Sequence, residues 1–427
     1  MRADHYHGPV ANLMQEQARV IAPAAISGWA AERPICVLWS TGAQARDHWL
    51  LIAEPSAIIR ANDRAGVEAF LSALSGADTS NCPPPSGSAL DAGWLAALSY
   101  ECGAIWEPRG FAAAPAPLPG WPLAEFLRCE PPTEDLLGCL AQECAPRQSW
   151  SASELLPTEP AGQFRRKVER TVELIRAGDI FQANLTHRFE ARLRGSRRAF
   201  AADALERIGA RYGAYIELDE QRAILSFSPE SFLRFDPATR KVVATPMKGT
   251  RPAPGALDEV ERAALEASPK DAAELAMIVD LMRNDLGRVC ESGSVRVAVD
   301  RLIERHPTVW QATAEVRGRL RRGLGIGDLL AATFPPGSVT GAPKTRALQV
   351  IGELEGTPRG PYCGALGFLG DDGSMNLSVA IRTIVIEGDR LMYGAGCGIV
   401  ADSDPEDEWR ECLQKTAVMR LALGLGL

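Results

Sequence analysis

Residues 179–189, DIFQANLTHRF, decide the local fold because apolar and polar side chains alternate along the whole stretch. A period of two is typical of a β-strand with two different faces. One face would carry Phe181, Ala183, Leu185 and Phe189, and the other would carry Gln182, Asn184 and Thr186. Two interpretations of the polar face are open. Its amides either line a polar pocket opposite an apolar core, or they meet solvent.

Helical patterns flank this strand on both sides. Before it, apolar residues recur at helical spacing from Phe164 onward, and Gly178 stands where a helix C-cap is expected. After it, ASPKDAAELAMIVDLMRNDLGRV (267–289) predicts a helix with Ser268 as N-cap and Pro269 in its first turn. The core stripe of that helix would consist of Leu275, Ile278, Met282 and Leu286.

β-rich segments dominate the rest of the chain. They are PICVLW (34–39), WLLIAEPSAII (49–59), GAYIEL (213–218), AILSFSPESFLRFD (223–236) and KVVATPMKGTRP (241–252). A last helix is predicted after Asp404 and Pro405. Long β segments separated by a few helices indicate an α+β fold and not a regular βαβ repeat. The Pro- and Ser-rich segment 146–160 is the best candidate boundary, between an N-terminal part over 1–150 and a second part over 160–427.

Composition excludes several classes of protein. The 427 residues are 46% hydrophobic and 23% charged, which matches a packed globular protein and excludes disordered and collagen-like chains. A net charge of −8 argues against a nucleic-acid partner, whose phosphates require a basic surface. No run approaches the roughly 18–20 apolar residues that span a bilayer, and MRADHYHGPV lacks the apolar core of a secretory signal. Ten scattered cysteines suit reduced thiols, so we expect a cytoplasmic protein without a membrane partner.

Lysine is scarce, and its rarity singles out each position. The six lysines among 46 basic residues are Lys167, Lys241, Lys248, Lys270, Lys344 and Lys415. Unlike arginine, lysine can lose its proton and act as a nucleophile. Lys248 ends a β run and precedes Gly249, so its amine would project into a pocket beside a flexible turn. The alternative interpretations are a solvated lysine at a strand end and a drift of the sequence toward arginine.

Two of the predicted helices carry acidic residues on one face. Asp271 and Glu274 are three residues apart on the first, and Glu408 and Glu411 are three apart on the second, with Lys415 one turn further. Carboxylates on two helices suit a Mg2+ ion that keeps several waters and completes its shell with an anionic substrate. The alternative is that they serve the helix dipole or a solvated face.

Three glycine-rich segments lie in the second half of the chain. They are PPGSVTGAPK (335–344), RGPYCGALGFLGDDG (359–373) and YGAGCGIVADSDPE (393–406). None has the spacing of a Walker A or dinucleotide-binding motif. Glycines beside strands either let backbone N–H groups approach an anion or form tight turns and bulges.

Taken together, these segments resemble the chorismate-utilising enzymes, which include anthranilate, aminodeoxychorismate, isochorismate and salicylate synthases. The matching motifs run in order through residues 164–421, and GWLAALSYECGAIWEPRG (93–110) is similar as well. The resemblance implies an anthranilate-synthase-like fold, with two packed β-sheets flanked by helices. In such a fold the segment near residue 150 is an internal loop.

The resemblance also implies a site for chorismate, a small dicarboxylate that binds with Mg2+ between its ring carboxylate and glutamates. The implied metal ligands are Glu274 and Glu411, with Asp271 and Glu408 helping through water. The implied substrate-binding residues are Tyr362, Arg382, Thr340, Lys415 and the backbone near Gly396 and Gly398. Glu230 in SFSPE matches the general acid that helps the C4 hydroxyl of chorismate to leave, because hydroxide is a poor leaving group.

Individual positions imply which member of the family this is. Isochorismate and salicylate synthases resemble one another in a lysine base where this chain has Gln182, and glutamine cannot activate water. Anthranilate synthases usually have alanine where this chain has Lys248, so Lys248 and Asn184 are similar to aminodeoxychorismate synthase component I. Gln311 stands in place of a histidine that is linked to pyruvate elimination, which fits an enzyme that retains the pyruvyl group. WLLIAEPSA is only loosely similar to the tryptophan-binding segment, so inhibition by tryptophan is not predicted.

The implied activity is amination of chorismate at C4 to 4-amino-4-deoxychorismate, on the way to p-aminobenzoate and folate. We expect no amidotransferase module in the chain, so ammonia would come from a separate glutamine amidotransferase subunit or from free ammonium. Anthranilate synthase component I is the alternative, and a non-catalytic chorismate-binding subunit is a third possibility. The presence of Glu230, Glu274, Glu411 and Lys248 favours an enzyme.

Overall fold

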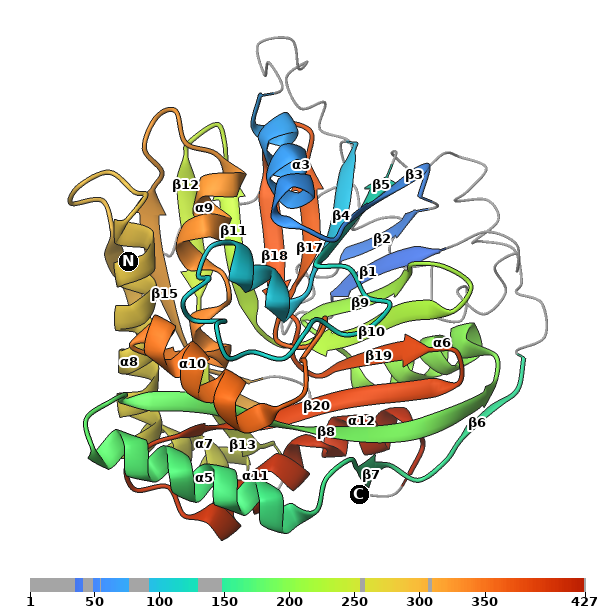
Figure 1. Cartoon of the computed structure of the whole chain (residues 1–427), viewed down its shortest axis with the longest axis vertical. Coiled ribbons are helices and arrows are strands. Elements are labelled where there is room, and N and C mark those ends of the chain that lie inside the picture. The colour runs from blue at the N-terminus through green and yellow to red at the C-terminus, as the bar shows by residue number, and fades with distance from the viewer. Residues whose placement is uncertain are drawn as a thin grey trace.

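The computed structural model describes residues 35–40, 49–53, 55–76, 92–129, 148–253, 258–305 and 309–425 (Figure 1). Their strands form two large sheets, and neighbouring strands in both sheets are antiparallel. In Figure 1 the long strands of the first sheet run across the view, whereas those of the second run along it. Among the described residues, no helix combines the length and the apolar character needed to cross a bilayer.

The first sheet is built around two long strands. Its members are β1 (Cys36–Ser40), β2 (Trp49–Ala53), β6 (Trp150–Ala152), β7 (Leu156–Pro157), β8 (Gln182–Gly195), β9 (Tyr212–Glu217), β10 (Arg222–Ser228), β16 (Gly341–Ala342), β19 (Thr383–Glu387) and β20 (Arg390–Ile399). The strand order is β16-β8-β20-β19-β10-β9-β1-β2, and β6 and β7 pair with β8. β8 pairs with β20 along nearly the whole length of β20, so their inner faces form one continuous wall.

The second sheet joins segments from both ends of the chain. Its members are β3 (Ala57–Ala61), β4 (Gly93–Leu98), β5 (Ala124–Cys129), β11 (Ser231–Asp236), β12 (Lys241–Thr245), β13 (Met247–Pro252), β14 (Arg296–Arg305), β15 (Val309–Arg319), β17 (Ala365–Gly370) and β18 (Met375–Val379). The order is β13-β15-β12-β11-β18-β17-β4-β5-β3, and β14 pairs with β15. The pairing of β4 with β17 ties a strand that precedes residue 150 to one that follows it.

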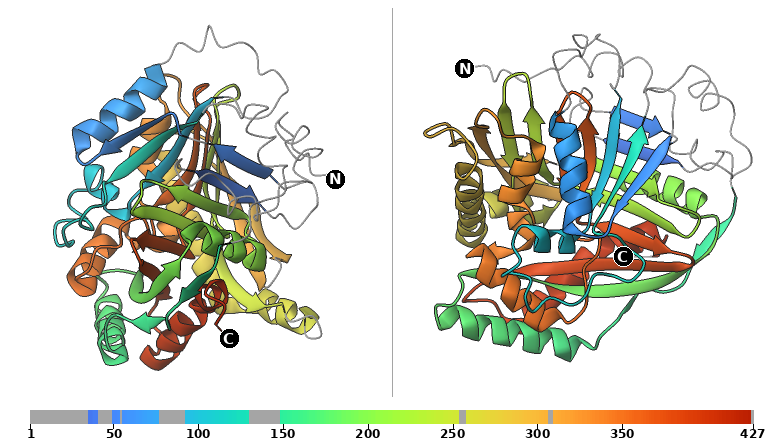
Figure 2. Two further views of the ribbon diagram at one scale, coloured as in Figure 1. Left: turned by 90° about the vertical axis from the view of Figure 1, so that its right-hand side faces the viewer. Right: turned by 45° about the horizontal axis from the view of Figure 1, so that its top comes forward.

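Four layers result, because the two sheets pack against each other and helices lie on the outer face of each (Figure 2). A shared core between the sheets contains Leu38 and Ile224 from the first sheet and Leu95 and Leu366 from the second. Helices α3 (Arg64–Gly76), α7 (Asp258–Glu266), α8 (Pro269–Gly287) and α9 (Ile326–Thr333) cover the outer face of the second sheet. Helices α5 (Ala161–Arg176), α6 (Arg197–Ile208), α10 (Lys344–Glu355), α11 (Pro405–Lys415) and α12 (Ala417–Ala422) cover the first. The predicted fold, two packed sheets flanked by helices, is confirmed.

The predicted helix ends are confirmed because they depend on local contacts. The Ser268 hydroxyl accepts the N–H of Asp271, and the Asp404 carboxylate accepts two N–H groups at the start of α11. Gly178 has a φ of 84°, a left-handed conformation that suits glycine just after α5. The predicted core stripe of α8 is also buried throughout, at Leu275, Ile278, Met282 and Leu286.

The strand prediction for 179–189 needs one correction. Phe181 was expected on the core face, but it precedes β8 and is 69% exposed, because its backbone N–H bonds to Ala342 at the rim of the sheet. It lines an open cleft of about 730 Å³ beside α8. The polar face of β8 is buried, with Gln182 only 1% exposed. The solvent-facing interpretation is therefore wrong, and the amides face the protein interior.

Candidate active site

Lys248 is aimed at α8 by a β-bulge. Lys248 pairs with Ala312 and Thr250 pairs with Gln311, so Gly249 is an extra residue in β13. Gly249 has a φ of 80°, which side chains other than glycine rarely adopt. The bulge places Nζ of Lys248 3.9 Å from Oε2 of Glu274 on α8, and both side chains are mostly buried. The alternative interpretation, a solvated lysine at a strand end, is therefore wrong for Lys248.

Lys248 also lies against the amide face of β8 and a glycine of β20. A Cβ at Gly398 would lie 2.9 Å from Nζ of Lys248 and only 2.2 Å from Nε2 of Gln182. Only glycine leaves room for both side chain ends at this point. Oε1 of Gln182 is buried and has no hydrogen-bond partner among the described residues. A buried amide oxygen without a partner costs free energy and marks a position where a ligand can donate.

Glu230 supplies an acid near this group. It lies between β10 and β11, directly before Ser231, and is 4% exposed. Burial raises its pKa from 4.5 to about 7, although the neighbouring Ser338 hydroxyl, the Lys248 ammonium and the N–H of Met247 oppose the shift. Glu230 therefore keeps its proton to a higher pH than an ordinary glutamate, which suits a group that donates a proton.

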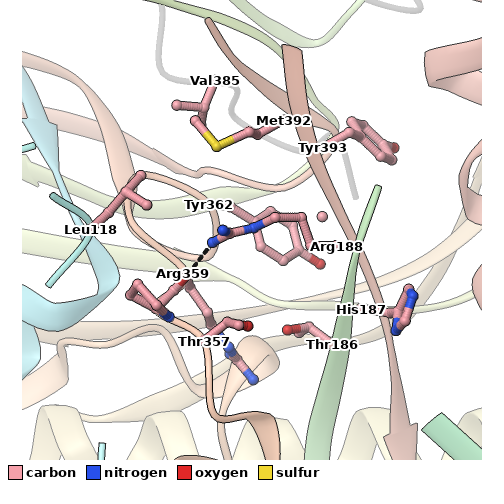
Figure 3. Close-up of a pocket in the computed structure, with 12 residues that line it drawn as sticks. Leu118, Thr186, His187, Arg188, Thr357, Arg359, Tyr362, Val385, Met392 and Tyr393 are labelled. Atoms are coloured by element: carbon pink, nitrogen blue, oxygen red, sulfur yellow. Dashed lines mark hydrogen bonds between the residues drawn. The ribbon is translucent and has the colours of Figure 1, made fainter. Parts of the chain in front are cut away.

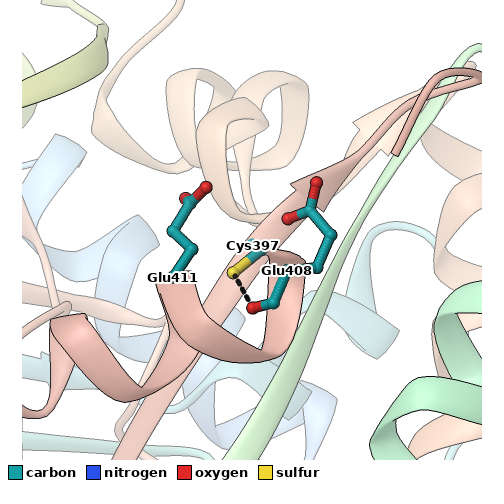
Figure 4. Close-up of side chains that lie close together, drawn as sticks. All are labelled: Cys397, Glu408 and Glu411. Carbon is teal, nitrogen blue, oxygen red and sulfur yellow. Dashed lines mark hydrogen bonds between the residues drawn. The ribbon is translucent and has the colours of Figure 1, made fainter. Parts of the chain in front are cut away.

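The four predicted metal-site carboxylates come from two helices that meet near Lys248. They are Asp271 and Glu274 on α8, and Glu408 and Glu411 on α11. Lys270 at the start of α8 lies 3.8 Å from Glu408, which ties the two helices together. Figure 4 shows Glu408 and Glu411 extending from α11 beside Cys397 of β20, and the ligand atoms of these three residues lie within 4.8 Å of one another.

The four carboxylates differ in how closely a basic side chain pairs with each of them. Asp271 pairs with Arg251 at 2.7 Å, and Glu411 pairs with Lys415 at 2.8 Å. Burial, with help from the charges of Glu411 and Asp271, raises the pKa of Glu274 against the opposing effect of Lys248 and Lys270. The pKa of Glu411 is lowered, because the cations, Lys415 above all, outweigh its burial.

The chemistry of this donor set fits a hard divalent cation. Glu274, Glu408 and Glu411 offer carboxylate oxygens, the ligands that Mg2+ prefers. Burial also raises the pKa of Glu408, so a nearby cation would stabilise its ionised form. Burial raises the pKa of the Cys397 thiol well above its ordinary value, and the thiol donates to the backbone oxygen of Glu408 at 3.3 Å. Cys397 is thus a neutral neighbour of the carboxylates.

Arg382 is a cation that has no anionic partner in the part of the chain that the structure describes. It has a φ of 50°, and among the described residues no carboxylate forms an ion pair with its guanidinium. Burial lowers its pKa, although the guanidinium of arginine remains charged. A half-buried cation without a carboxylate partner is stabilised by a bound anion, so Arg382 is a candidate for a substrate carboxylate. It makes no hydrogen bond to Lys248, Gln182 or Glu230.

Tyr362 stands against β20, on the same wall as Gly398. A Cβ at Gly394 would come within 2.3 Å of its ring, so Gly394 allows the ring to lie flat on the strand. Figure 3 shows Tyr362 beside a small cavity of about 30 Å³ that Thr186 and Arg188 of β8 also line. Burial raises the pKa of Tyr362 well above its ordinary value, so its hydroxyl stays protonated and can donate to an anion.

Backbone contacts hold the other predicted substrate residues. Thr340 is fully buried, and its carbonyl accepts the N–H of Asn184 at 2.7 Å. Lys415 donates to the carbonyl of Gly396 at 2.7 Å, which fixes α11 against β20. Gly398 lies opposite Asn184 in the register of β20 with β8. The predicted residues of β8, β20 and α11 are therefore brought together.

Sequence reasoning missed two buried polar residues near the site and left one without a role. Ser338 lies in the quoted segment PPGSVTGAPK and neighbours Glu230, but its position was not singled out. Ser231 directly follows Glu230, and its buried hydroxyl has no partner among the described residues. The amide of Gln311 is fully buried, and neither its oxygen nor its nitrogen has a partner there. For Ser231, its position directly after Glu230 was the available sequence signal, whereas Ser338 and Gln311 reach their neighbours only in the fold.

The comparisons with known proteins agree with this geometry. The family model described as chorismate binding enzyme matches residues 34–421, nearly the whole chain. The chain belongs to this family of chorismate-binding enzymes. Relatives of two activities are similar to it. Aminodeoxychorismate synthase component 1 of Klebsiella aerogenes is 41% identical over 59% of this chain and 56% of its own length. Anthranilate synthase component 1 of Streptomyces coelicolor is 39% identical over 73% of this chain and 57% of its own length.

A solved structure supports the fold of this chorismate-binding enzyme. Anthranilate synthase component I from Streptococcus pneumoniae TIGR4 has a TM-score of 0.73 and 27% sequence identity, and covers 92% of this chain and 93% of that one. The alignments with the first curated relatives span only 56–61% of their length. The family and the fold are therefore established, and the relatives named for the two amination reactions do not separate the possible activities.

Proposed function

We propose that this chorismate-binding enzyme aminates chorismate at C4, as an aminodeoxychorismate synthase component I. The observation that supports this choice is the place of Lys248. Its amine lies beside the buried amide of Gln182, near Glu230 and 3.9 Å from Glu274. A lysine in this position supplies a nucleophile within a site lined by acids, whereas a site for direct attack by ammonia needs no amine there.

In the first step the neutral amine of Lys248 adds to C2 of chorismate. The electron pairs of the ring shift toward C4, and the C4–O bond breaks. The departing hydroxyl takes a proton from Glu230 and leaves as water, so that Glu230 becomes a carboxylate. The pKa of about 7 suits this exchange, because the acid is protonated before the step and stable as an anion after it.

In the second step ammonia adds at C4 and the C2–N bond to Lys248 breaks. The electron pairs shift back, the lysine nitrogen leaves as a neutral amine, and a proton of the ammonium group formed at C4 returns to Glu230. The net reaction converts chorismate and ammonia to 4-amino-4-deoxychorismate and water. Gln182 has no basic group, so it can hold a substrate oxygen by its amide but cannot activate water for a competing addition.

Binding would use the charges on either side of Lys248. Glu274 and Glu411 would hold Mg2+, with Asp271 and Glu408 assisting through water. When bound, the ion would neutralise the ring carboxylate of chorismate and orient it. Arg382 and Tyr362 would bind a carboxylate of the substrate, because the first is an unpaired cation and the second keeps its hydroxyl proton. Thr340, Lys415, Asn184 and the backbone at Gly396 and Gly398 would complete the pocket.

We further propose a cytoplasmic protein that receives ammonia from a separate glutamine amidotransferase subunit. The relatives are named component 1, which implies a partner component for those proteins. The product would serve p-aminobenzoate and folate synthesis.

Anthranilate synthase component I is the second candidate, since relatives of that name are equally similar. The test is incubation of the purified chain with chorismate, Mg2+ and ammonium at mildly alkaline pH, followed by product identification by mass and absorbance. Aminodeoxychorismate that becomes p-aminobenzoate only after a lyase is added supports the proposal. Anthranilate with released pyruvate overturns it.

A further inference from the structure

The outer edge of β8 lacks a partner strand along the part that faces the site. β16 pairs only with the first two residues of β8, and β7 pairs only with residues 189–190. Between these short strands the edge presents the carbonyl of Asn184 and the N–H of Thr186, which a neighbouring strand would ordinarily satisfy. Both residues lie on the buried polar face of the sheet.

Two charged side chains occupy the place of the missing strand. Nη2 of Arg359 donates to the carbonyl of Asn184 at 2.7 Å, and Oε1 of Glu355 accepts the N–H of Thr186 at 2.8 Å. Arg359 and Glu355 also pair with each other through two hydrogen bonds of 2.8 and 2.6 Å. Each residue is only 5% exposed, so this ion pair is shielded from solvent. Its two side chains supply the hydrogen bonds that a neighbouring strand would otherwise make with this edge of β8.

The same guanidinium reaches the segment that carries Thr340. Its Nη1 donates at 2.8 Å to the carbonyl of Val339, which belongs to the peptide group that continues to Thr340. The ring of Tyr100 covers the guanidinium, with its centroid 4.4 Å from the central carbon. One planar group therefore fixes two peptide groups that come from segments more than 150 residues apart in the chain.

The backbone of Arg359 is fixed as well. The buried carboxylate of Glu101 accepts the N–H of Arg359 at 2.7 Å and the N–H of Gly360 at 3.1 Å. Gly360 has a φ of 62° and begins the turn that leads to Tyr362. In Figure 3 Arg359 and Tyr362 lie on neighbouring sides of the small cavity. The turn that carries Tyr362 is thus tied to the sheet edge through Arg359.

We propose that Arg359 is a positioning residue that sets the relative places of Asn184, Thr340 and Tyr362. The proposal rests on the proposed function only in taking these three as contacts of chorismate. Arginine suits the task because its fork of N–H groups lies in one plane and can serve several acceptors at fixed angles. Lysine keeps the charge but offers one nitrogen, so it cannot hold both carbonyls and the carboxylate of Glu355 in their places.

The test compares Arg359→Lys with Arg346→Lys. Arg346 is an arginine of α10 that is about one third exposed and pairs with Asp179. We expect Arg359→Lys to weaken chorismate binding in the presence of Mg2+, measured by calorimetry, and to lower kcat/KM by about 10- to 100-fold, as a displacement near 1 Å does. Arg346→Lys should stay within about twofold of the wild type.

The outcomes separate this inference from the proposed function. Wild-type chorismate affinity and kcat/KM in folded Arg359→Lys overturn the inference, and so does a lowered Tm with unchanged affinity, because that is a purely structural role. Should the wild type produce anthranilate, the proposed function fails while the affinity comparison still decides the role of Arg359.

A second variant covers the case in which Arg359→Lys does not fold. Glu355→Gln keeps an acceptor for the N–H of Thr186 but removes the charge that orients Arg359. Weaker binding of chorismate by this variant supports the inference, and wild-type affinity overturns it.

Discussion

A single methyl group on Gly398 should separate catalysis from folding. In Gly398→Ala the new Cβ would lie 2.2 Å from Nε2 of Gln182 and 2.9 Å from Nζ of Lys248. Ordinary contacts begin near 3.4 Å, so the end of Gln182 must retreat by about 1.2 Å and the end of Lys248 by about 0.5 Å. Both atoms end flexible side chains, so they move more easily than backbone, and the stability cost should stay near 1–2 kcal/mol.

The catalytic cost should be larger than the structural one. A misplacement of about 1 Å at the reacting groups lowers rates by about 100-fold, so we expect that loss in kcat for chorismate amination. The assay follows product by mass at saturating ammonium and Mg2+, and circular dichroism checks the fold. Gly287→Ala is the matched control, because a Cβ at this glycine of α8 would meet nothing within 4 Å. Wild-type kcat in folded Gly398→Ala would refute the view that the ends of Gln182 and Lys248 lie at the reacting centre.

Four further predictions test individual groups. Lys248→Ala should lower C4 amination, followed by product mass, on the order of 1000-fold or more, and an unchanged C4 product rate contradicts the covalent route. The neutral form of Glu230 stabilises the fold fully below pH 4.5, and this contribution is lost as pH rises through its folded pKa of about 7. In urea unfolding, the free energy of unfolding of Glu230→Gln relative to that of the wild type should therefore rise by about 2–3 kcal/mol between about pH 5 and pH 8. A difference that stays constant with pH counts against the raised pKa. Arg382→Gln should weaken chorismate binding in calorimetry by about 10- to 100-fold, and equal affinity would remove Arg382 from the site. Chelation by EDTA should abolish turnover, and Glu411→Gln should raise the Mg2+ concentration required by about tenfold while Glu406→Gln does not; turnover in EDTA would exclude the metal.

The fold was predictable where a contact is local in sequence. The cap at Ser268 needs only the N–H of Asp271, and the turn at Gly178 needs only the end of α5. The burial of the amide face of β8 depends on distant segments, since β16 and β20 follow β8 by about 150 to 200 residues. Alternation along one strand cannot show whether such partners exist. The same limit misplaced Phe181, whose exposure is decided by where β16 begins and ends.

The residues of the candidate site likewise divide into those that the sequence could indicate and those that depend on distant contacts. Residue types at fixed spacing drew attention to Lys248 and to the acidic pairs of α8 and α11, because their chemistry is visible in the sequence. Arg359 gave no such signal, since its role comes from two backbone carbonyls and the carboxylate of Glu101, which no spacing relates to it. Lys344 is the opposite case, because lysine is rare in this chain and a catalytic role for Lys344 could therefore be inferred from the sequence. It is buried on Asp285 and two carbonyls, as a structural clamp.

The charges of the proposed site link the binding of Mg2+ to the binding of chorismate. The carboxylates are Asp271, Glu274, Glu408 and Glu411, and the cations other than Lys248 are Arg251, Lys270, Arg382 and Lys415. These two sets balance each other. Mg2+ and the dicarboxylate chorismate carry equal and opposite charges, so their joint binding preserves the balance while Glu230 is protonated. Mg2+ alone would add two positive charges to the site, and chorismate alone would add two negative charges. Joint binding of metal and substrate is therefore the state in which these charges balance.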